Sequence, residues 1–161
     1  MSGGAEANSV TQEAEQSVSP VKFPARPENS CFGCGGGNAR GMKLEFEGDA
    51  ATKHVWGKFA LGAEYQGGGG YLHGGIIAVV LDEAMGKLAR LAEQRAVTAE
   101  LSVEYLKPIP ADSEIFVESF ETERNGRQLY HRAEIKNAEG VVLARGKGRF
   151  VVVRDLKQQK T

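Results

Sequence analysis

The sequence lacks the features of disulfide-rich, secreted and membrane-spanning proteins. Only two cysteines occur among its 161 residues, too few for a disulfide framework, which predicts a reducing compartment. No window of about 18 apolar residues is present, because charged side chains interrupt the most apolar stretch, residues 76–91. The first 20 residues lack the basic and apolar regions of a secretory signal. These absences predict a soluble, cytoplasmic chain with no membrane partner.

The sequence also lacks an excess of charge of either sign. Lys and Arg total 20 and Asp and Glu total 21, which gives a formal net charge of −1. Proteins that bind nucleic acid carry a basic footprint on their surface, and no such excess is present here. The charge balance therefore predicts no nucleic-acid partner.

Length and composition predict one domain between two tails. A chain of 161 residues normally forms a single domain that buries about two thirds of its unfolded surface. Residues 1–29 are predicted to be a disordered N-terminal tail with an extended, proline-containing lead-in. The folded domain is expected over residues 30–153, and residues 154–161 are expected to be a charged C-terminal tail.

Hydrophobic periodicity predicts one long helix and a series of antiparallel strands. From residue 74 to about residue 92, apolar side chains recur at helical spacing, and the first half of this segment is apolar nearly all round. Period-two alternation predicts strands over residues 97–105, 115–120, 128–136 and 141–153. A first hairpin is expected from residues 42–46 and 53–59, and Asn125-Gly126 predicts a tight turn between two later strands.

These elements predict an α+β fold. A single hydrophobic helix is buried only when a curved sheet wraps around it. The last predicted strand supports this arrangement, because Ala144, Gly146 and Gly148 share one face and are small enough for a helix to approach closely.

Glycine is concentrated in two segments. Eleven of the 21 glycines lie within residues 33–41 and 67–75, and neither segment matches a phosphate loop or the dinucleotide spacing. The second segment leads into the predicted helix, whose N-terminus carries unpaired N–H groups and the positive end of the dipole. Gly74 and Gly75 could therefore donate N–H groups to a developing oxyanion, as acyl transfer requires. Alternatively, the glycines only permit a tight corner.

Asp82 is the candidate catalytic carboxylate. It lies in the apolar part of the helix, where a carboxylate is costly unless it is functional or satisfied by backbone or hydroxyl groups. Burial would raise its pKa and make it a better base. The neighbouring Glu83 is expected to be solvated or to form a salt bridge between subunits.

The spacing of Gly74 and Asp82 predicts an oligomeric site. Eight residues separate them, or about 12 Å along a helix. A base and an oxyanion donor must both stand about 3 Å from one reacting carbonyl. Two antiparallel copies of the helix across a two-fold axis could meet this requirement, so a catalytic site here predicts at least a dimer.

Three motifs resemble the hotdog-fold acyl-CoA thioesterases. The first is Gln66-Gly67-x-x-Gly70-x-x-His73-Gly74-Gly75, followed by Asp82 and Thr98. The others are Cys31-Phe-Gly-Cys34-Gly with Asn38 and Gly41 downstream, and Val103-x-Tyr105-x-x-Pro108-x-Pro110. They are similar to the branch that contains the phenylacetate-pathway thioesterase and the thioesterase superfamily member proteins. The resemblance spans residues 31 to about 153 and implies the hotdog fold, in which a curved antiparallel sheet wraps around one long central helix.

The resemblance also implies roles for individual residues. Asp82 would attack the thioester or activate water, and the N–H of Gly74 would polarise the thioester carbonyl. Thr98 would hold the water or the carboxylate in place, and His73 would shape the loop or contact the substrate. Further candidates for substrate contacts are Gln66, Gly75 and Asn38, of which Asn38 also suits a turn.

The implied function is hydrolysis of acyl-CoA thioesters to free acid and coenzyme A. The expected assembly is a homodimer or a dimer of dimers, with no metal and no cofactor beyond the coenzyme A of the substrate. Two alternatives are an acyl-thioester hydratase or dehydratase of the same fold and a non-catalytic acyl-CoA-binding regulator.

Two further motifs have more than one interpretation. Cys31 and Cys34 could form half of a zinc site or a redox pair, but the sequence shows no second pair of ligands, so structural thiols are favoured. The basic stripe Arg145, Lys147 and Arg149 could hold the phosphates of coenzyme A. The favoured alternative is a solvated face that pairs with Glu114 or Glu118.

Overall fold

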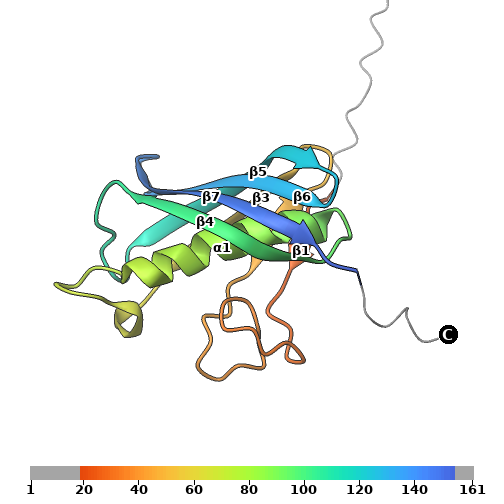
Figure 1. Cartoon of the computed structure of the whole chain (residues 1–161). Coiled ribbons are helices and arrows are strands. Elements are labelled where there is room, and N and C mark those ends of the chain that lie inside the picture. The colour runs from red at the N-terminus through yellow and green to blue at the C-terminus, as the bar shows by residue number, and fades with distance from the viewer. Residues whose placement is uncertain (1–18, 155–161) are drawn as a thin grey trace, which may run out of the picture.

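The structure, a computed structural model, describes residues 19–154. It contains one long helix and seven strands. In chain order the elements are β1 (Val21–Phe23), β2 (Phe46–Asp49), β3 (His54–Ala60), the 3₁₀ turn η1 (Ala63–Tyr65), α1 (Gly74–Leu91), β4 (Ala96–Tyr105), β5 (Glu114–Asn125), β6 (Gln128–Lys136) and β7 (Val142–Val152) (Figure 1). The predictions for residues 1–18 and 155–161 lie outside the described residues.

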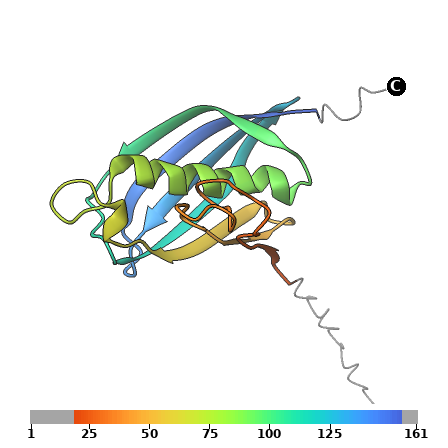
Figure 2. The ribbon, with the colours of Figure 1, turned by 90° about the horizontal axis from the view of Figure 1, so that it is seen from below.

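The strands form a single antiparallel sheet in the order β1-β2-β3-β5-β6-β7-β4. Figure 2 shows α1 lying along the concave face of this curved sheet. The loop between β1 and β2 lies on the other side of the helix (Figure 1). The predicted α+β arrangement of a curved sheet around one helix is therefore confirmed.

The core lies between α1 and the concave face of the sheet. Close contact is possible where β7 carries small residues, since a Cβ on Gly146 would stand only 3.2 Å from Met85 Cε and 3.3 Å from Leu81 Cβ. A larger side chain there would push the helix away from the sheet. The residues that α1 buries are Ile77, Val80, Leu81, Ala84, Met85, Leu88 and Ala89. Among the described residues, no helix has the length and apolar character needed to cross a membrane.

Two predicted segments near the N-terminus differ in the structure. The expected strand over residues 42–46 begins only at Phe46, because the N–H groups of Met42 and Leu44 bond to carbonyls of the preceding loop, at 2.7 and 2.9 Å. Lys43 between them has a φ of 53°, which interrupts an extended strand. Residues 21–23, expected in the lead-in outside the domain, form β1 and pair with β2.

One carboxylate on the sheet is almost enclosed and doubly paired. Glu121 on β5 has a side chain that is 7% exposed and bonds to Lys53 at 2.7 Å and to Arg124 at 2.8 Å. Burial alone would raise the pKa of Glu121, but the hydrogen bonds from Arg124 and Lys53 lower it to about 2. Glu121 therefore contributes more to stability as a carboxylate than as a carboxylic acid.

This pairing predicts a pH-dependent contribution to stability. The pKa of Glu121 is lower in the folded state than in the unfolded state, so its contribution is present above pH ~4.5 and is lost as the pH falls toward ~2. Over that window the loss amounts to at most about 3 kcal/mol. We expect Glu121→Gln to reduce the free energy of unfolding at pH 7, measured with urea, and the difference from wild type to shrink as the pH is lowered.

The exposed neighbour Glu123 provides the matched control. Glu123→Gln should follow the wild-type profile at every pH. A difference between Glu121→Gln and wild type that does not change between pH 7 and pH 2 would contradict the assigned ion pairs.

Candidate active site

The structure brings Asp82 and Thr98 together. Asp82 lies on the flank of α1 that faces β4, and the hydroxyl of Thr98 on that strand donates to Asp82 Oδ1 at 2.8 Å. Burial raises the pKa of Asp82, the Thr98 hydrogen bond lowers it in part, and the nearby charge of Glu83 raises it further, so that the net direction is upward. A half-buried carboxylate with a raised pKa and one ordered hydroxyl partner can act as a base or as a nucleophile.

The N-terminus of α1 is capped by His73. Its Nδ1 accepts a hydrogen bond from the N–H of Gly75 at 2.9 Å. The N–H of Gly74, the first residue of the helix, has no acceptor within the helix, and the described residues supply none from elsewhere. The hydroxyl of Tyr105 donates to the Gly74 carbonyl at 2.9 Å and so fixes this turn against β4. Of the two predicted oxyanion donors, Gly74 therefore remains available, whereas Gly75 serves the cap.

The glycine segment before the helix is a tight, anchored loop. Gly69 and Gly70 have φ values of 65° and 83°, which glycine adopts without strain. The N–H of His73 donates to the carbonyl of Tyr65 at 2.9 Å. Gln66 lies exposed at the start of the loop, where its backbone pairs with Leu72. The loop thus holds its backbone in place at the entrance to α1.

The side chain of Asn38 bonds within its own loop. Its Oδ1 accepts from the N–H of Arg40 at 3.0 Å and its Nδ2 donates to the carbonyl of Ser30 at 3.3 Å. Both polar atoms of the side chain are therefore engaged within the loop between β1 and β2. The structure supports the turn alternative for Asn38, and its contact with substrate stays a prediction.

A cavity of about 330 Å³ adjoins the candidate carboxylate. Asp82 and Thr98 line it together with Phe150, and Cys31, Cys34 and Glu83 line it as well. Of the predicted site residues, Asp82 and Thr98 thus share one cavity. His73, Gly74, Gly75 and Gln66 lie toward the other end of the helix.

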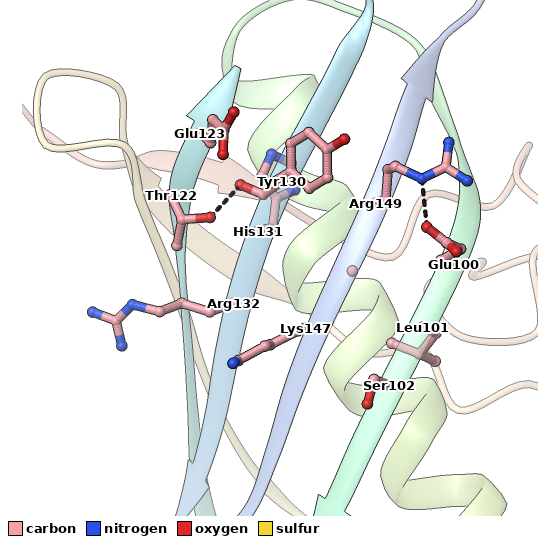
Figure 3. A pocket seen from close by; sticks show the side chains of 11 residues that line it. Glu100, Leu101, Ser102, Thr122, Glu123, Tyr130, His131, Arg132, Lys147 and Arg149 are labelled. Carbon is pink, nitrogen blue, oxygen red and sulfur yellow. Dashed lines mark hydrogen bonds and ion pairs between the residues drawn. The ribbon is translucent and has the colours of Figure 1, made fainter. Parts of the chain in front are cut away.

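A larger cavity of about 750 Å³ lies on the sheet and does not include Asp82. Figure 3 shows that Arg132, Lys147 and Arg149 line it, and that Arg149 is paired with Glu100. Arg145, which continues the stripe of Lys147 and Arg149 on β7, is paired with Glu134 at 3.3 Å. Two residues of the basic stripe, Arg145 and Arg149, are therefore charge-paired, and their partners are Glu134 and Glu100 rather than the predicted Glu114 and Glu118.

Sequence reasoning missed the environment of Glu83. This carboxylate is neither solvated nor left for another subunit, because Lys87 lies 3.1 Å from its Oε2 and the thiol of Cys31 donates to its Oε1 at 3.2 Å. The spacing of Glu83 and Lys87, four residues apart on a helix, was the available signal. Cys34 lies beside them, and burial raises the pKa of its thiol to about 11. The ligand atoms of Cys31, Cys34 and Glu83 lie within 4.8 Å of one another, so these three side chains could hold a metal ion.

Comparison with known proteins finds similarity to thioesterases. Residues 69–144 match the model of the thioesterase superfamily. The acyl-coenzyme A thioesterase THEM4 of Rattus norvegicus is 35% identical over 89 residues, which cover 55% of this chain and 38% of the rat protein. THEM4 of Mus musculus is 37% identical over 81 residues, which cover 50% of this chain and 35% of the mouse protein. The chain thus matches less than half of the length of these relatives.

Solved structures agree with this match. A crystal structure of a thioesterase superfamily protein has a TM-score of 0.70 and 29% identity, and the match covers 76% of this chain and 60% of that one. The PaaI protein of the E. coli phenylacetic acid degradation operon has a TM-score of 0.65 and 15% identity, over 72% of this chain and 83% of that one. The protein smu.793 of Streptococcus mutans, solved bound to acetyl CoA, has a TM-score of 0.61 and 19% identity, over 63% of this chain and 82% of that one.

The sheet, the central helix and these likenesses define a hotdog-fold protein, and the predicted fold is confirmed. Residues 69–144 match the thioesterase superfamily model and the rat relative is an acyl-coenzyme A thioesterase, so the resemblance inferred from the motifs is confirmed as well.

Proposed function

We propose that this chain hydrolyses acyl-CoA thioesters to the free acid and coenzyme A. The observation that carries the proposal is the half-buried Asp82 carboxylate, which accepts a hydrogen bond from Thr98 at 2.8 Å and lines a cavity. The name of the rat and mouse relatives, acyl-coenzyme A thioesterase, supports the same class of substrate.

Asp82 can take part in hydrolysis in either of two ways. As a general base it removes a proton from water while the water oxygen attacks the thioester carbonyl. As a nucleophile its carboxylate forms an anhydride with the acyl group, and water then hydrolyses this anhydride. In both routes the carbon–sulfur bond breaks and the coenzyme A thiolate leaves and is protonated. Because a thiolate leaves readily, this chemistry requires neither a metal nor a cofactor.

The oxyanion that develops on the thioester carbonyl needs a donor, and we assign this role to the N–H of Gly74. A helix N-terminus favours negative charge there. Gly74 and Asp82 of one chain are about 12 Å apart along the helix, too far to act on one carbonyl. The proposed site therefore pairs Asp82 of one chain with Gly74 of a second, antiparallel copy, in a dimer or a dimer of dimers.

The edge of the sheet at β4 supports such an assembly. β4 is ten residues long, ends the sheet and is largely exposed. Val97 and Tyr105 are 53% and 54% exposed. Tyr105, which pairs with the buried Ala144, lies on the side of the sheet that carries α1, whereas Val97, which pairs with Val151, lies on the other side. A long exposed edge with apolar side chains is a surface that pairs readily with another chain. A second copy at this edge would adjoin both Thr98 and the N-terminal turn of α1.

The alternatives fit the arrangement less well. A hydratase or dehydratase would use a histidine as acid or base, whereas the Nδ1 of His73 already accepts a hydrogen bond from the Gly75 N–H at the N-terminus of α1. A non-catalytic acyl-CoA-binding regulator would give no reason for a half-buried carboxylate held by a hydroxyl group.

Asp82→Asn should separate catalysis from binding. The amide keeps the size of the side chain but cannot remove a proton or form an anhydride, so turnover of short, long and aromatic acyl-CoAs should fall at least about a hundredfold. Binding of a non-hydrolysable acyl-CoA thioether, measured by calorimetry, should persist. Asp112→Asn, at an exposed position with a φ of 61° that asparagine tolerates, is the matched control. Unchanged turnover in Asp82→Asn would rule out the proposed mechanism.

Gly74→Pro removes the proposed oxyanion donor and leaves the helix able to form, because proline is well tolerated at the first helical position. Turnover should fall about a hundredfold or more, while circular dichroism and thermal unfolding stay close to wild type. In Gly74→Ala the N–H is retained, and the added Cβ meets Tyr105 at an ordinary contact distance of 3.4 Å. We expect this control to keep far more activity than Gly74→Pro, and equal losses would argue against the donor.

The same two variants test whether the site spans two chains. In a mixed dimer of Asp82→Asn and Gly74→Pro, one site combines the intact Asp82 of one chain with the intact Gly74 of the other. Unfolding and refolding the two inactive variants together should therefore restore part of the activity. No recovery, despite mixed dimers detected by native mass spectrometry, would place both groups in one chain.

His73→Asn tests the hydratase alternative. Asparagine is a favourable N-cap, so this variant should keep the stability of α1 and retain hydrolysis within a few-fold. His73→Ala should lose about 1 kcal/mol in the free energy of unfolding, as expected when a cap is removed. Loss of all turnover in a stably folded His73→Asn would instead indicate a catalytic imidazole.

A further inference from the structure

The cysteine loop and α1 together form a cluster that lines the same cavity as Asp82 and that the proposed hydrolysis does not use. Cys31 and Cys34 come from the loop between β1 and β2, and Glu83 comes from the helix. Their ligand atoms lie within 4.8 Å of one another, and Cys31 Sγ is already 3.2 Å from Glu83 Oε1. With Zn–S distances near 2.3 Å and Zn–O distances near 2.0 Å, tetrahedral ligands stand roughly 3.5–3.8 Å apart. A contraction of about 1 Å would therefore complete a coordination shell.

From this cluster we propose that Cys31, Cys34 and Glu83 bind one soft divalent cation, Zn²⁺, with the fourth position left to solvent. Two sulfur ligands favour zinc over Mg²⁺, Ca²⁺ or Mn²⁺, which prefer oxygen. The sequence alone could not supply the third ligand, because Glu83 is 49 residues from Cys34 and on a different element. The proposed hydrolysis needs no metal, although the cation would stand in the cavity that Asp82 also lines.

The loop is closely packed around the two thiols. The N–H of Gly35 donates to the Cys31 carbonyl at 2.9 Å, which closes the turn that carries both cysteines. A Cβ on Gly33 would stand 2.4 Å from Glu83 Oε1, so only glycine lets the loop lie this close to the carboxylate. The first glycine-rich segment, which the hydrolysis does not use, thus brings the sulfurs to the helix.

The charges in the cluster also balance for a divalent ion. With neutral thiols, the carboxylate of Glu83 is compensated by Lys87 at 3.1 Å, and the side chains of this pair are only 16% and 13% exposed. When the metal binds, two thiol protons leave and one divalent cation enters. The net charge of this half-buried group therefore stays at zero, and no uncompensated charge is buried. Lys87 lies beside the carboxylate oxygen that does not bond Cys31, and it also interacts with the Cys34 thiol, so its ammonium group would compensate the thiolate as well.

Zinc binding by the reduced, metal-free full-length chain tests the proposal. Calorimetry should give one equivalent of Zn²⁺ per chain, and Co²⁺ should produce the absorption bands of thiolate coordination. Zinc should raise the unfolding temperature of the wild type, because it binds the folded state. Cys31→Ser and Glu83→Gln should each weaken the affinity at least about tenfold. Glu139→Gln, an exposed carboxylate in a distant turn, should bind zinc like the wild type.

Three results would overturn the proposal. The first is no zinc uptake by reduced wild-type protein that is shown to be folded. The second is unchanged affinity in both Cys31→Ser and Glu83→Gln, which would indicate adventitious binding. The third is a Cys31–Cys34 disulfide in the purified protein with no zinc uptake after reduction, which would assign the pair to redox chemistry. Acyl-CoA hydrolysis, measured separately on the metal-free chain, keeps a failure here distinct from a failure of the proposed function.

Discussion

The packing of α1 into the concave face of the sheet is the constraint on which the rest of the structure depends. The helix can lie this close because β7 offers Gly146 and Gly148 where other strands carry larger side chains. The resulting proximity places the flank of α1 beside β4 at the end of the sheet. Asp82 on that flank is therefore partly shielded from water and still within 2.8 Å of the Thr98 hydroxyl. A helix held farther from the sheet would leave this carboxylate solvated and without its partner.

Local signals in the sequence predict most of this fold. The helical spacing predicts α1 to within a residue at its C-terminal end, and Asn125-Gly126 correctly marks the turn between β5 and β6, where Gly126 has a φ of 58°. The predictions fail where hydrogen bonds between residues far apart in the sequence determine the local structure. Met42 and Leu44 alternate with Phe46 like a strand, but their N–H groups bond to the cysteine loop, and pairing with a distant β2 turns residues 21–23 into β1.

The residues of the candidate site were likewise predicted only in part. Asp82 and Thr98 share a spacing typical of a known family, and the structure brings the two side chains together. Glu83 was misjudged because its partners depend on how the loop between β1 and β2 folds, and the same fold places Asn38 in the turn that the sequence left open as an alternative. The side-chain amide of Asn38 forms hydrogen bonds with Ser30 and Arg40. Glu83 accepts a hydrogen bond from Cys31, which lies 52 residues earlier in the sequence. No periodicity or motif within the helix indicates that Glu83 contacts Cys31.

Asp82 and Glu83 are adjacent on α1 and line the same cavity, but their side chains are held by different elements. Successive residues of an α-helix are about 100° apart around its axis, so Asp82 faces Thr98 on the sheet while Glu83 faces Cys31 on the loop. The sheet holds α1 by directional hydrogen bonds as well as by apolar packing. The hydroxyl of Ser119 donates to the Ala84 carbonyl at 2.7 Å, and that of Tyr105 to the Gly74 carbonyl at 2.9 Å. The contact of Glu83 with Cys31 adds a directional tie between the helix and the loop. The loop is therefore bonded to the neighbour of the candidate catalytic carboxylate and lines the same cavity.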